Sequence, residues 1–339
     1  MTRRGWALFA AMCVIWGVPY LLIRVAVRDF SPGTLVFSRC VLGGLLLLPF
    51  ALARGGFGLV LRRWRWVLLF TVLELAVPWL ALSDAETVLS SSLTGLLIAA
   101  VPLVGVVAAV VLGSEDQGGG WLRYGGLALG LIGVGVLLGL DVGDTSARAL
   151  AEVGVVVVGY ALGPVILSRR LADLPSIPVV ATTLLITAVG YLPVALTHWP
   201  AGVSWKSGWS VVGLGSICTA LAFVLFFALI AEIGPARATV ITYVNPAVAV
   251  LLGVLLLGED LTIGIAIGFP LILVGSVLAA RRDAPVDAVP EVALADPLCG
   301  DDTDQSSRTN PLGVANVAAT SPRSSTSGPS QVTSTPSSG

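Results

Sequence analysis

Ten stretches of about 20 mainly apolar residues, separated by charges or by glycine and proline clusters, constrain this chain of 339 residues most strongly. Composition agrees, because 56% of the residues are hydrophobic, 12% are charged and the mean hydropathy is +0.94. Strands of a membrane barrel would instead alternate polar and apolar residues. We therefore predict an all-α membrane protein with ten transmembrane helices, at 6–25, 33–53, 66–83, 91–112, 121–140, 150–168, 178–197, 208–230, 236–257 and 262–280.

Basic residues are distributed unevenly between these helices. With a cytoplasmic N-terminus, twelve arginines before the C-terminal tail lie on the cytoplasmic side, namely Arg3, Arg4, Arg54, Arg62, Arg63, Arg65, Arg123, Arg169, Arg170, Arg237, Arg281 and Arg282. The other side then holds only Arg24, Arg28, Arg148 and Lys206. Because cytoplasmic loops are enriched in Lys and Arg, we predict a multi-pass protein of the cell (plasma) membrane with both termini in the cytoplasm.

The second part of the chain repeats the first. An offset of 144 positions relates Pro49 to Pro193, Pro102 to Pro246, Glu115 to Glu259 and Asp116 to Asp260. We interpret this offset as two homologous halves of five helices, residues 1–144 and 145–283. Five is odd, so the second half enters the membrane from the opposite side and the repeats are predicted to be inverted, as in many secondary transporters. Residues 284–339, rich in Ser and Thr, are predicted to form a disordered cytoplasmic tail.

Two segments resemble a known family. "WGVPYLLIRVAVRDFSPGTLVFSRC" (16–40) is similar to the first two helices of the drug/metabolite transporter superfamily, EamA type, with Trp-Gly in helix one, a basic residue eight positions later and an Arg in helix two. "TALAFVLFFALIAEIGPARATVITYVNPAVAVLLGVLLLGEDLT" (219–262) resembles the signature of the second half. The segment "GSED" (113–116) departs from the usual Gly-Glu. The resemblance implies a ten-helix transporter of small metabolites.

Residues for catalysis or cofactor binding are sparse. The four cysteines show no metal-binding spacing, the chain has one histidine, and it contains no GxSG, HExxH or nucleotide-binding motif. We therefore expect no enzymatic activity, no metal, no cofactor and no nucleic-acid partner.

Two charged residues fall inside predicted spans. Glu74 lies about 12 Å from the cytoplasmic end of its helix, where an unpaired carboxylate is costly. It is predicted to couple transport to protons or to bind a substrate amine, and a structural ion pair or a protonated, hydrogen-bonded acid is the alternative. Arg39 either snorkels outward or meets Glu74, Asp84 or Glu86. The resemblance favours a structural or gating role for Arg39 over direct substrate binding.

Aromatic and amide side chains within the spans are candidates for lining a substrate cavity. Gly17 with Pro19, and Gly163 with Pro164, are predicted to interrupt helices and to release backbone groups for a polar ligand or water. Ordinary helix packing is the alternative. The candidate substrate-binding residues are Trp16, Tyr20, Glu74, Trp79, Tyr160, Tyr243 and Asn245.

Glycine patterns predict local packing. "GGLALGLIGVGVLLG" (125–139) contains Gly126 and Gly130, and Gly135 and Gly139, at the small-xxx-small spacing that favours close helix contact over phosphate binding. "GED" (258–260) is predicted to cap the ninth helix and begin a turn.

These patterns together predict a secondary active transporter of a small organic metabolite, an amino acid or drug-like compound, that works by alternating access and acts as an exporter. Protons as the coupling ion compete with uniport or exchange. A non-transporting membrane receptor or scaffold with the same fold is the second hypothesis. The predicted partners are the substrate and membrane lipid, and the protein is either a monomer or a homodimer.

Overall fold

The computed structural model describes residues 2–111, 121–141, 146–238 and 240–280, and all regular elements in these ranges are helices. Up to Asp141 they are α1 Arg3–Ile15, α2 Pro19–Ala26, α3 Pro32–Arg54, α4 Phe57–Arg62, α5 Trp64–Phe70, the π-helix η1 Thr71–Ala76, α6 Val77–Ala85, α7 Ser91–Ile98, α8 Val101–Val111 and α9 Trp121–Asp141. The remainder are α10 Ala147–Arg170, α11 Ser176–Thr197, α12 Trp205–Gly215, η2 Ser216–Leu221, α13 Ala222–Ile233, α14 Pro235–Ala238, α15 Ile241–Leu252, η3 Gly253–Leu257 and α16 Ile263–Ala280. The predicted tail 284–339 and the segment "GSED" lie outside the described residues.

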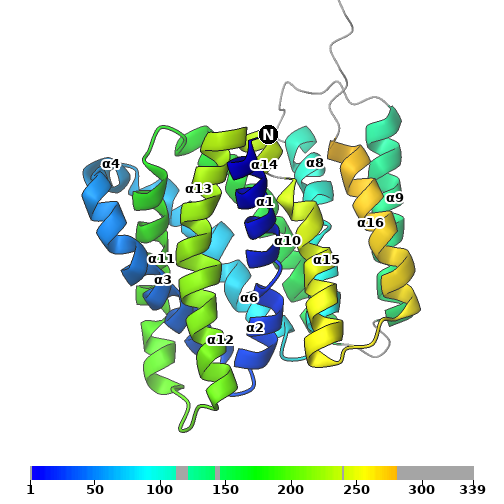
Figure 1. Cartoon of the computed structure of the whole chain (residues 1–339), viewed down its shortest axis with the longest axis horizontal. Helices are drawn as coiled ribbons and strands as arrows, with labels where there is room; N and C mark the ends of the chain where they lie inside the picture. Colours follow the sequence, from blue (N-terminus) through cyan, green and yellow to red (C-terminus); the bar gives the residue numbers. More distant parts are fainter. Residues whose placement is uncertain (1, 112–120, 142–145, 239, 281–339) are drawn as a thin grey trace, which may run out of the picture. The chain divides into compact units, whose positions relative to one another are not determined.

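The apolar helices coincide with the ten predicted stretches. Among the described residues, eight helices are long and apolar enough to cross a membrane, and two shorter apolar helices are Ile241–Leu257 and Ile263–Ala279. Figure 1 shows them running largely alongside one another, with the N-terminus at the upper end of α1. The chain is therefore a multi-pass membrane protein.

Only one of the two predicted proline interruptions ends a helix. The first span is divided between α1, which ends at Ile15, and α2, which begins at Pro19, where proline suits the first helical turn. The prediction for Gly163 and Pro164 is wrong, since α10 continues through both to Arg170. A proline removes one backbone hydrogen bond, and within a membrane bundle this loss is tolerated without ending the helix.

Glycines bring α9 and α16 into contact. A Cβ atom added at Gly126 would lie 2.5 Å from the backbone nitrogen of Ala279, and one added at Gly275 would collide with the backbone of Gly130. Figure 1 shows these two helices side by side. The predicted close packing is thus confirmed for Gly126 and Gly130. It is wrong for Gly135 and Gly139, where a Cβ would meet no atom within 4 Å.

Helix boundaries follow the offset of 144 positions found in the sequence. The helix starts at Arg3, Pro32 and Ser91 are followed 144 positions later by the starts Ala147, Ser176 and Pro235. The π-helices η1 and η2 interrupt the third apolar span of each half at nearly the same point. Packing contacts join α3 to α11, α9 to α16, α6 to α10 and α1 to α13, so most close pairs take one helix from each half.

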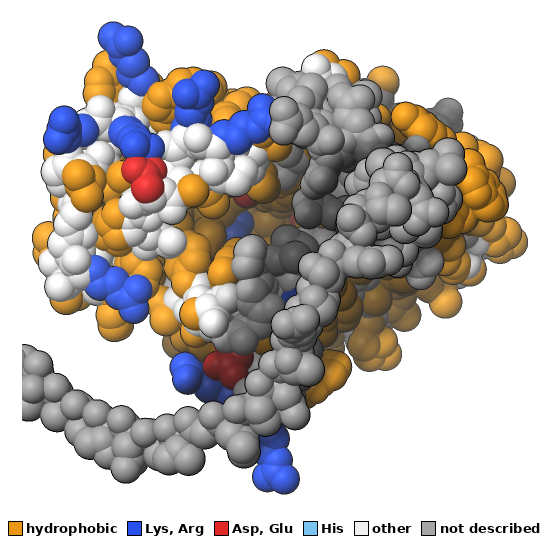
Figure 2. Space-filling model, turned by 90° about the horizontal axis from the view of Figure 1, so that it is seen from above, with side chains coloured by type: hydrophobic (Ala, Val, Ile, Leu, Met, Phe, Trp, Pro, Cys, Tyr) orange, Lys and Arg blue, Asp and Glu red, His pale blue; other side chains and the backbone are white. Residues whose placement is uncertain are grey.

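Charged side chains gather at the ends of the bundle. Figure 2 looks onto the end that carries the N-terminus, where Lys and Arg side chains stand among apolar ones. The three ion pairs of the described residues, Arg63–Asp173, Arg148–Asp84 and Arg148–Glu152, all lie at helix ends. The interior is divided into three apolar clusters, and Tyr160 packs against the two largest.

Candidate functional site

A buried arginine lies at the centre of the candidate site. Arg39 on α3 is only 8% exposed, and its Nε donates a hydrogen bond of 2.9 Å to Oγ1 of Thr219 on η2. Its guanidinium carbon lies 3.6 Å from the centre of the Trp79 ring on α6, in a cation–π contact. Gly43, one turn along α3, permits this arrangement, because a Cβ there would lie 2.8 Å from the Thr219 methyl group.

The π-helix η2 positions Thr219 for this contact. Its hydroxyl donates to the carbonyl of Leu214, five residues earlier, at 2.7 Å, which satisfies the wider turn of a π-helix. The same oxygen is thereby oriented to accept from Arg39. Thr219 therefore connects η2 to α3 while it also bonds its own helix.

Arg39 has no acidic partner among the described ion pairs. None of Glu74, Asp84 and Glu86 forms an ion pair with Arg39 among the described residues, although Glu86 lies close enough to interact with it electrostatically. Snorkelling of Arg39 is wrong, because its side chain is buried. Asp84, near the end of α6, instead forms an ion pair with Arg148. A guanidinium carries five N–H donors, and one hydrogen bond to a neutral hydroxyl leaves donors available for an anion.

Glu74 lies on η1 with its side chain against α10. Its Oε2 is buried without a hydrogen-bond partner, and a Cβ added at Gly163 would collide with this atom. Gly163 thus does not break a helix, as the sequence suggested, but makes room for the carboxyl group. The structural ion pair that was an alternative for Glu74 is absent from the described ion pairs.

Three of the predicted aromatic residues gather around Arg39. Trp79 contacts it directly, and Tyr20 and Tyr160 lie close enough to interact with it electrostatically. Tyr160 also lies near Glu74 and beside Trp79. Tyr20 and Trp79 are buried, at 8% and 6% exposure. We call Tyr20, Arg39, Glu74, Trp79 and Tyr160 the central cluster, which α2, α3, η1, α6 and α10 supply.

The remaining predicted site residues have partners of their own elsewhere. Trp16 packs against Phe226, with ring centres 4.6 Å apart. The Tyr243 hydroxyl donates to the carbonyl of Ser276 at 3.4 Å. With its amide oriented to match its acceptors, Asn245 donates to the carbonyls of Cys13 and Ile241 at 3.1 and 3.0 Å, which ties α15 to α1. Substrate binding by these three residues stays a prediction.

A second polar group lies where α6 ends and α7 begins. Glu259 accepts hydrogen bonds from the backbone nitrogens of Ser91 and Ser92 at 2.8 and 2.9 Å, so it caps the start of α7. The predicted turn after the ninth span is confirmed, because Gly258 adopts the left-handed conformation with φ 67°. That Glu259 would cap a different helix could not be read from its local sequence.

Glu86, just beyond α6, is fully buried and neither carboxylate oxygen has a hydrogen-bond partner in the described part of the chain. Arg24 lies nearby but donates to the backbone carbonyls of Glu86 and Thr87, at 2.5 and 2.9 Å. Burial therefore raises the pKa of Glu86 well above its ordinary value. The sequence predicts Glu86 only as a possible partner of Arg39, because a position at a helix end gives no sign of burial.

Comparison with known proteins decides the family. The sequence model of the EamA-like transporter family matches residues 3–139 and again residues 153–281. This chain belongs to the EamA-like transporter family. The resemblance seen in the sequence is thereby confirmed, and the central cluster is a feature of a membrane transporter.

Similar proteins are also named as transporters. The chain is 31% identical over 268 residues to YedA of Escherichia coli strain K12, an uncharacterized inner membrane transporter, covering 76% of this chain and 83% of YedA. It is 25% identical over 284 residues to the uncharacterized transporter YvbV of Bacillus subtilis strain 168, covering 81% and 91%. A crystal structure among those that match has a TM-score of 0.60 and 23% identity, covers 83% of this chain and 97% of its own, and supports the same fold.

The central cluster of this EamA-like transporter combines three kinds of chemistry. The Arg39 guanidinium can donate to an anion, the aromatic faces can contact an apolar body, and Glu74 can exchange a proton. All three lie inside the bundle, where weak screening strengthens electrostatic interactions. The arrangement suits a small molecule that carries both an acidic and an apolar part.

Proposed function

We propose that this protein is a secondary active transporter that exports a small carboxylate-bearing metabolite, of the amino-acid class, across the inner (plasma) membrane by alternating access. The observation that carries the proposal is the buried Arg39, which has no acidic partner among the described ion pairs. A charge inside a membrane bundle is costly and marks a functional site. A substrate carboxylate would supply the missing countercharge.

The substrate carboxylate binds Arg39 in this proposal, and the apolar part of the substrate lies against Trp79 and Tyr160. The cation–π contact holds the guanidinium plane in place and leaves its N–H edge for a bidentate carboxylate. Tyr20 and Tyr160 flank Arg39 on the α2 and α10 sides. This pose makes Arg39 a direct ligand, whereas the resemblance favoured a structural or gating role.

Glu74 is the proposed coupling group. Its unpartnered Oε2 faces α10 and belongs to the central cluster that holds the substrate in this proposal. A protonated Glu74 is tolerated in this apolar setting, and loss of its proton changes the electrostatic balance around Arg39 and Tyr160. Proton binding and substrate binding are thereby linked, and substrate exchange without protons is the competing mechanism.

The two halves, residues 1–144 and 145–283, are proposed to be inverted repeats that exchange roles between inward-open and outward-open states. This is supported by helix starts 144 positions apart, by close pairs that take one helix from each half, and by the double match to one family model. The excess of arginines at the end that carries the N-terminus supports cytoplasmic termini.

Transient currents from proteoliposomes on a solid support test the proposal. The purified protein is challenged with pooled amino acids, nucleosides and cationic drugs at several pH values, beside Arg39→Gln and Arg39→Lys. Lys206→Gln, an exposed cation at a helix end, is the matched control. We expect the amino-acid pool, whose members carry a carboxylate, to produce a current. Arg39→Gln should abolish this current, and Lys206→Gln should keep it. A response to the cationic pool that is independent of Arg39 would contradict it.

Ligand-induced thermal stabilisation separates transport from mere binding. If amino acids stabilise the protein through Arg39 but radiolabelled substrate never crosses the membrane under any imposed gradient, the receptor hypothesis replaces the transporter. If neither stabilisation nor flux depends on Arg39, the central cluster is not the binding site.

A further inference from the structure

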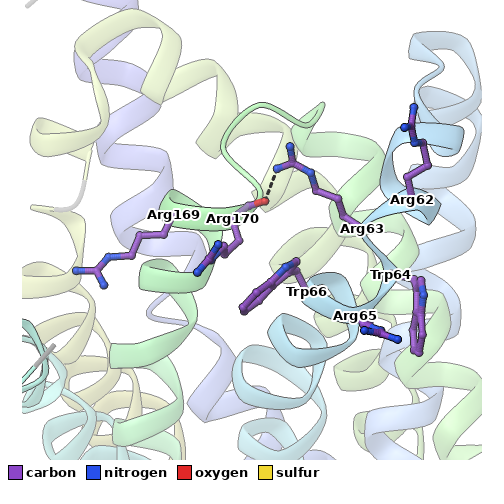
Figure 3. Close-up of a pocket in the computed structure, with 7 residues that line it drawn as sticks. All are labelled: Arg62, Arg63, Trp64, Arg65, Trp66, Arg169 and Arg170. Carbon is purple, nitrogen blue, oxygen red and sulfur yellow. Dashed lines mark hydrogen bonds between the residues drawn. The ribbon is translucent and has the colours of Figure 1, made fainter.

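A cavity of about 640 Å³ opens at the end of the bundle where α4, α5 and α10 meet. We call it the basic pocket, and its lining residues are Arg62, Arg63, Arg65, Arg169 and Arg170 with Trp64 and Trp66. Figure 3 shows the ring of Trp66 beside Arg170, with Arg65 beside Trp64 and Arg62 at the outer edge. It is separate from the central cluster and is built from different side chains.

One arginine of the basic pocket is held in place by its own partners. Arg63 donates 2.7 Å hydrogen bonds to both carboxylate oxygens of Asp173, and a third of 2.6 Å to the carbonyl of Arg170. This forked contact joins the start of α5 to the end of α10. Asp173 therefore offsets only Arg63, and the described ion pairs include none of Arg62, Arg65 and Arg170.

Aromatic rings orient two more arginines. The guanidinium of Arg170 lies 4.5 Å from the centre of the Trp66 ring, and that of Arg65 lies 5.6 Å from the Trp64 ring. Contact with a ring occupies the face of a guanidinium, and its N–H edge stays able to bind the oxygens of a phosphate. The pocket thus presents several positive donors toward one open cavity, which favours an anion.

The pocket lies at the level expected for lipid headgroups. Trp64 begins one membrane span and Arg170 ends another. Trp64 is 55% exposed, as is typical of tryptophans at a membrane interface, and Leu68 and Leu69, one turn deeper on α5, are each 40% exposed. A lipid phosphate could bind the arginines while its acyl chains cover the exposed leucines. A soluble phosphate would use only the charges.

We infer that the basic pocket binds the phosphate-containing headgroup of an anionic phospholipid, with Arg62, Arg65 and Arg170 as ligands and Trp66 as its floor. The bound headgroup would bridge α5 and α10. Since α5 runs directly into η1, which carries Glu74, and α10 carries Gly163, the lipid would stabilise the packing that surrounds the Glu74 carboxyl group.

Native mass spectrometry and thermal unfolding of the full chain in neutral detergent test this inference, with phosphatidylglycerol, phosphatidylcholine or inorganic phosphate added. Phosphatidylglycerol should bind and raise the unfolding temperature, whereas phosphatidylcholine should not. Arg62→Gln/Arg170→Gln should weaken phosphatidylglycerol binding by about 30-fold, because each of the two lost cations contributes about fivefold and the two factors multiply. Arg3→Gln/Arg4→Gln, which removes two charges outside the pocket, should bind normally.

Each other outcome overturns the inference. Equal stabilisation by inorganic phosphate would assign the pocket to a soluble anion, and equal weakening in Arg3→Gln/Arg4→Gln would reduce it to general attraction by net charge. If the glutamine variant unfolds without lipid, Arg62→Lys/Arg170→Lys keeps the charges and should still prefer phosphatidylglycerol. A wild-type protein that shows no preference for phosphatidylglycerol over phosphatidylcholine would exclude the site. These readouts require no transport, so they stand apart from the proposed function.

Discussion

Three helices of the first half have counterparts in the second half that begin 144 positions later, yet among the described residues the buried charged side chains lie in the first half alone. Among the described residues, Arg39 and Glu86 are buried, whereas the buried polar residues of the second half are all Ser or Thr. At the same offset, Arg39, Glu74 and Glu86 correspond to Thr183, Cys218 and Ile230. The two halves can therefore have similar helix positions without having similar side chains at equivalent positions.

The second half still completes the site that the first half begins. Thr219 accepts the hydrogen bond from Arg39, and Gly163 and Tyr160 of α10 face Glu74 and Arg39. In the proposed mechanism, the first half binds the substrate and the proton, while the second half supplies neutral partners. Variants in both halves should show where the halves differ and where they behave alike.

Arg39→Gln should have the largest effect. We expect substrate flux to fall by roughly 100-fold or more, because the substrate carboxylate would lose its charged partner. Thr183→Val, at the equivalent position, should keep near-normal flux, since the Thr183 hydroxyl bonds only the carbonyl of Val180 on its own helix at 2.8 Å. Flux in proteoliposomes measures both. Equal losses would mean that the two halves contribute alike.

Gly126→Ala and Gly275→Ala should destabilise the protein by similar amounts, about 1–3 kcal/mol each, because either added Cβ meets the backbone of the partner helix. Here the two halves are expected to behave alike. Gly135→Ala, where a Cβ meets nothing within 4 Å, is the control and should leave the unfolding temperature nearly unchanged. Thermal unfolding in detergent measures all three. A stable Gly275→Ala protein would refute the close α9–α16 contact.

Glu74→Gln should lower proton-driven flux by about tenfold and remove its pH dependence, because the amide cannot exchange a proton. Gly163→Ala should have a similar effect, since its methyl group would displace the Glu74 carboxyl group. Cys218→Ala, at the position equivalent to Glu74, should keep the pH profile. Flux measured across a pH series distinguishes them. A pH profile that survives Glu74→Gln would favour exchange without protons.

Glu259→Gln should cost about 1 kcal/mol of stability, because it weakens charge-assisted hydrogen bonds at the start of α7. Asp260→Asn changes an exposed neighbouring carboxylate and should have no measurable effect. Chemical unfolding in mild detergent is the measurement. If the two variants lose equal stability, Glu259 does not cap α7.

Glu86 should make stability depend on pH in a small but definite direction. Because burial raises its pKa in the folded protein, its contribution is full below the ordinary value of 4.5 and is lost as pH rises through the folded value. Glu86→Gln should therefore flatten the fall in unfolding temperature toward neutral pH. Asp29 should act in the opposite direction, since hydrogen bonds from Ser204 lower its pKa.

For the site, the sequence predicted which residues come together but not which partners they contact. Five of the predicted residues, Tyr20, Arg39, Glu74, Trp79 and Tyr160, assemble, because rare polar and aromatic residues deep in a span tend to face the interior. Their partners could not be predicted. Arg39 bonds Thr219 and contacts Trp79, and it forms no ion pair with the three carboxylates that the sequence offered as partners. The rise along a helix determines the depth of a side chain but not which neighbouring helix it faces.

Sequence alone determined the membrane class, the positions of the apolar helices, the interval of 144 between the halves and the family resemblance, because apolar length and repeated residues are local properties of the chain. Tertiary structure alone decided that α10 continues through Pro164, that Gly126 but not Gly135 faces a partner helix, and that Glu86 is buried. Each of these depends on how helices rotate against one another, and that rotation is set by packing between residues far apart in sequence.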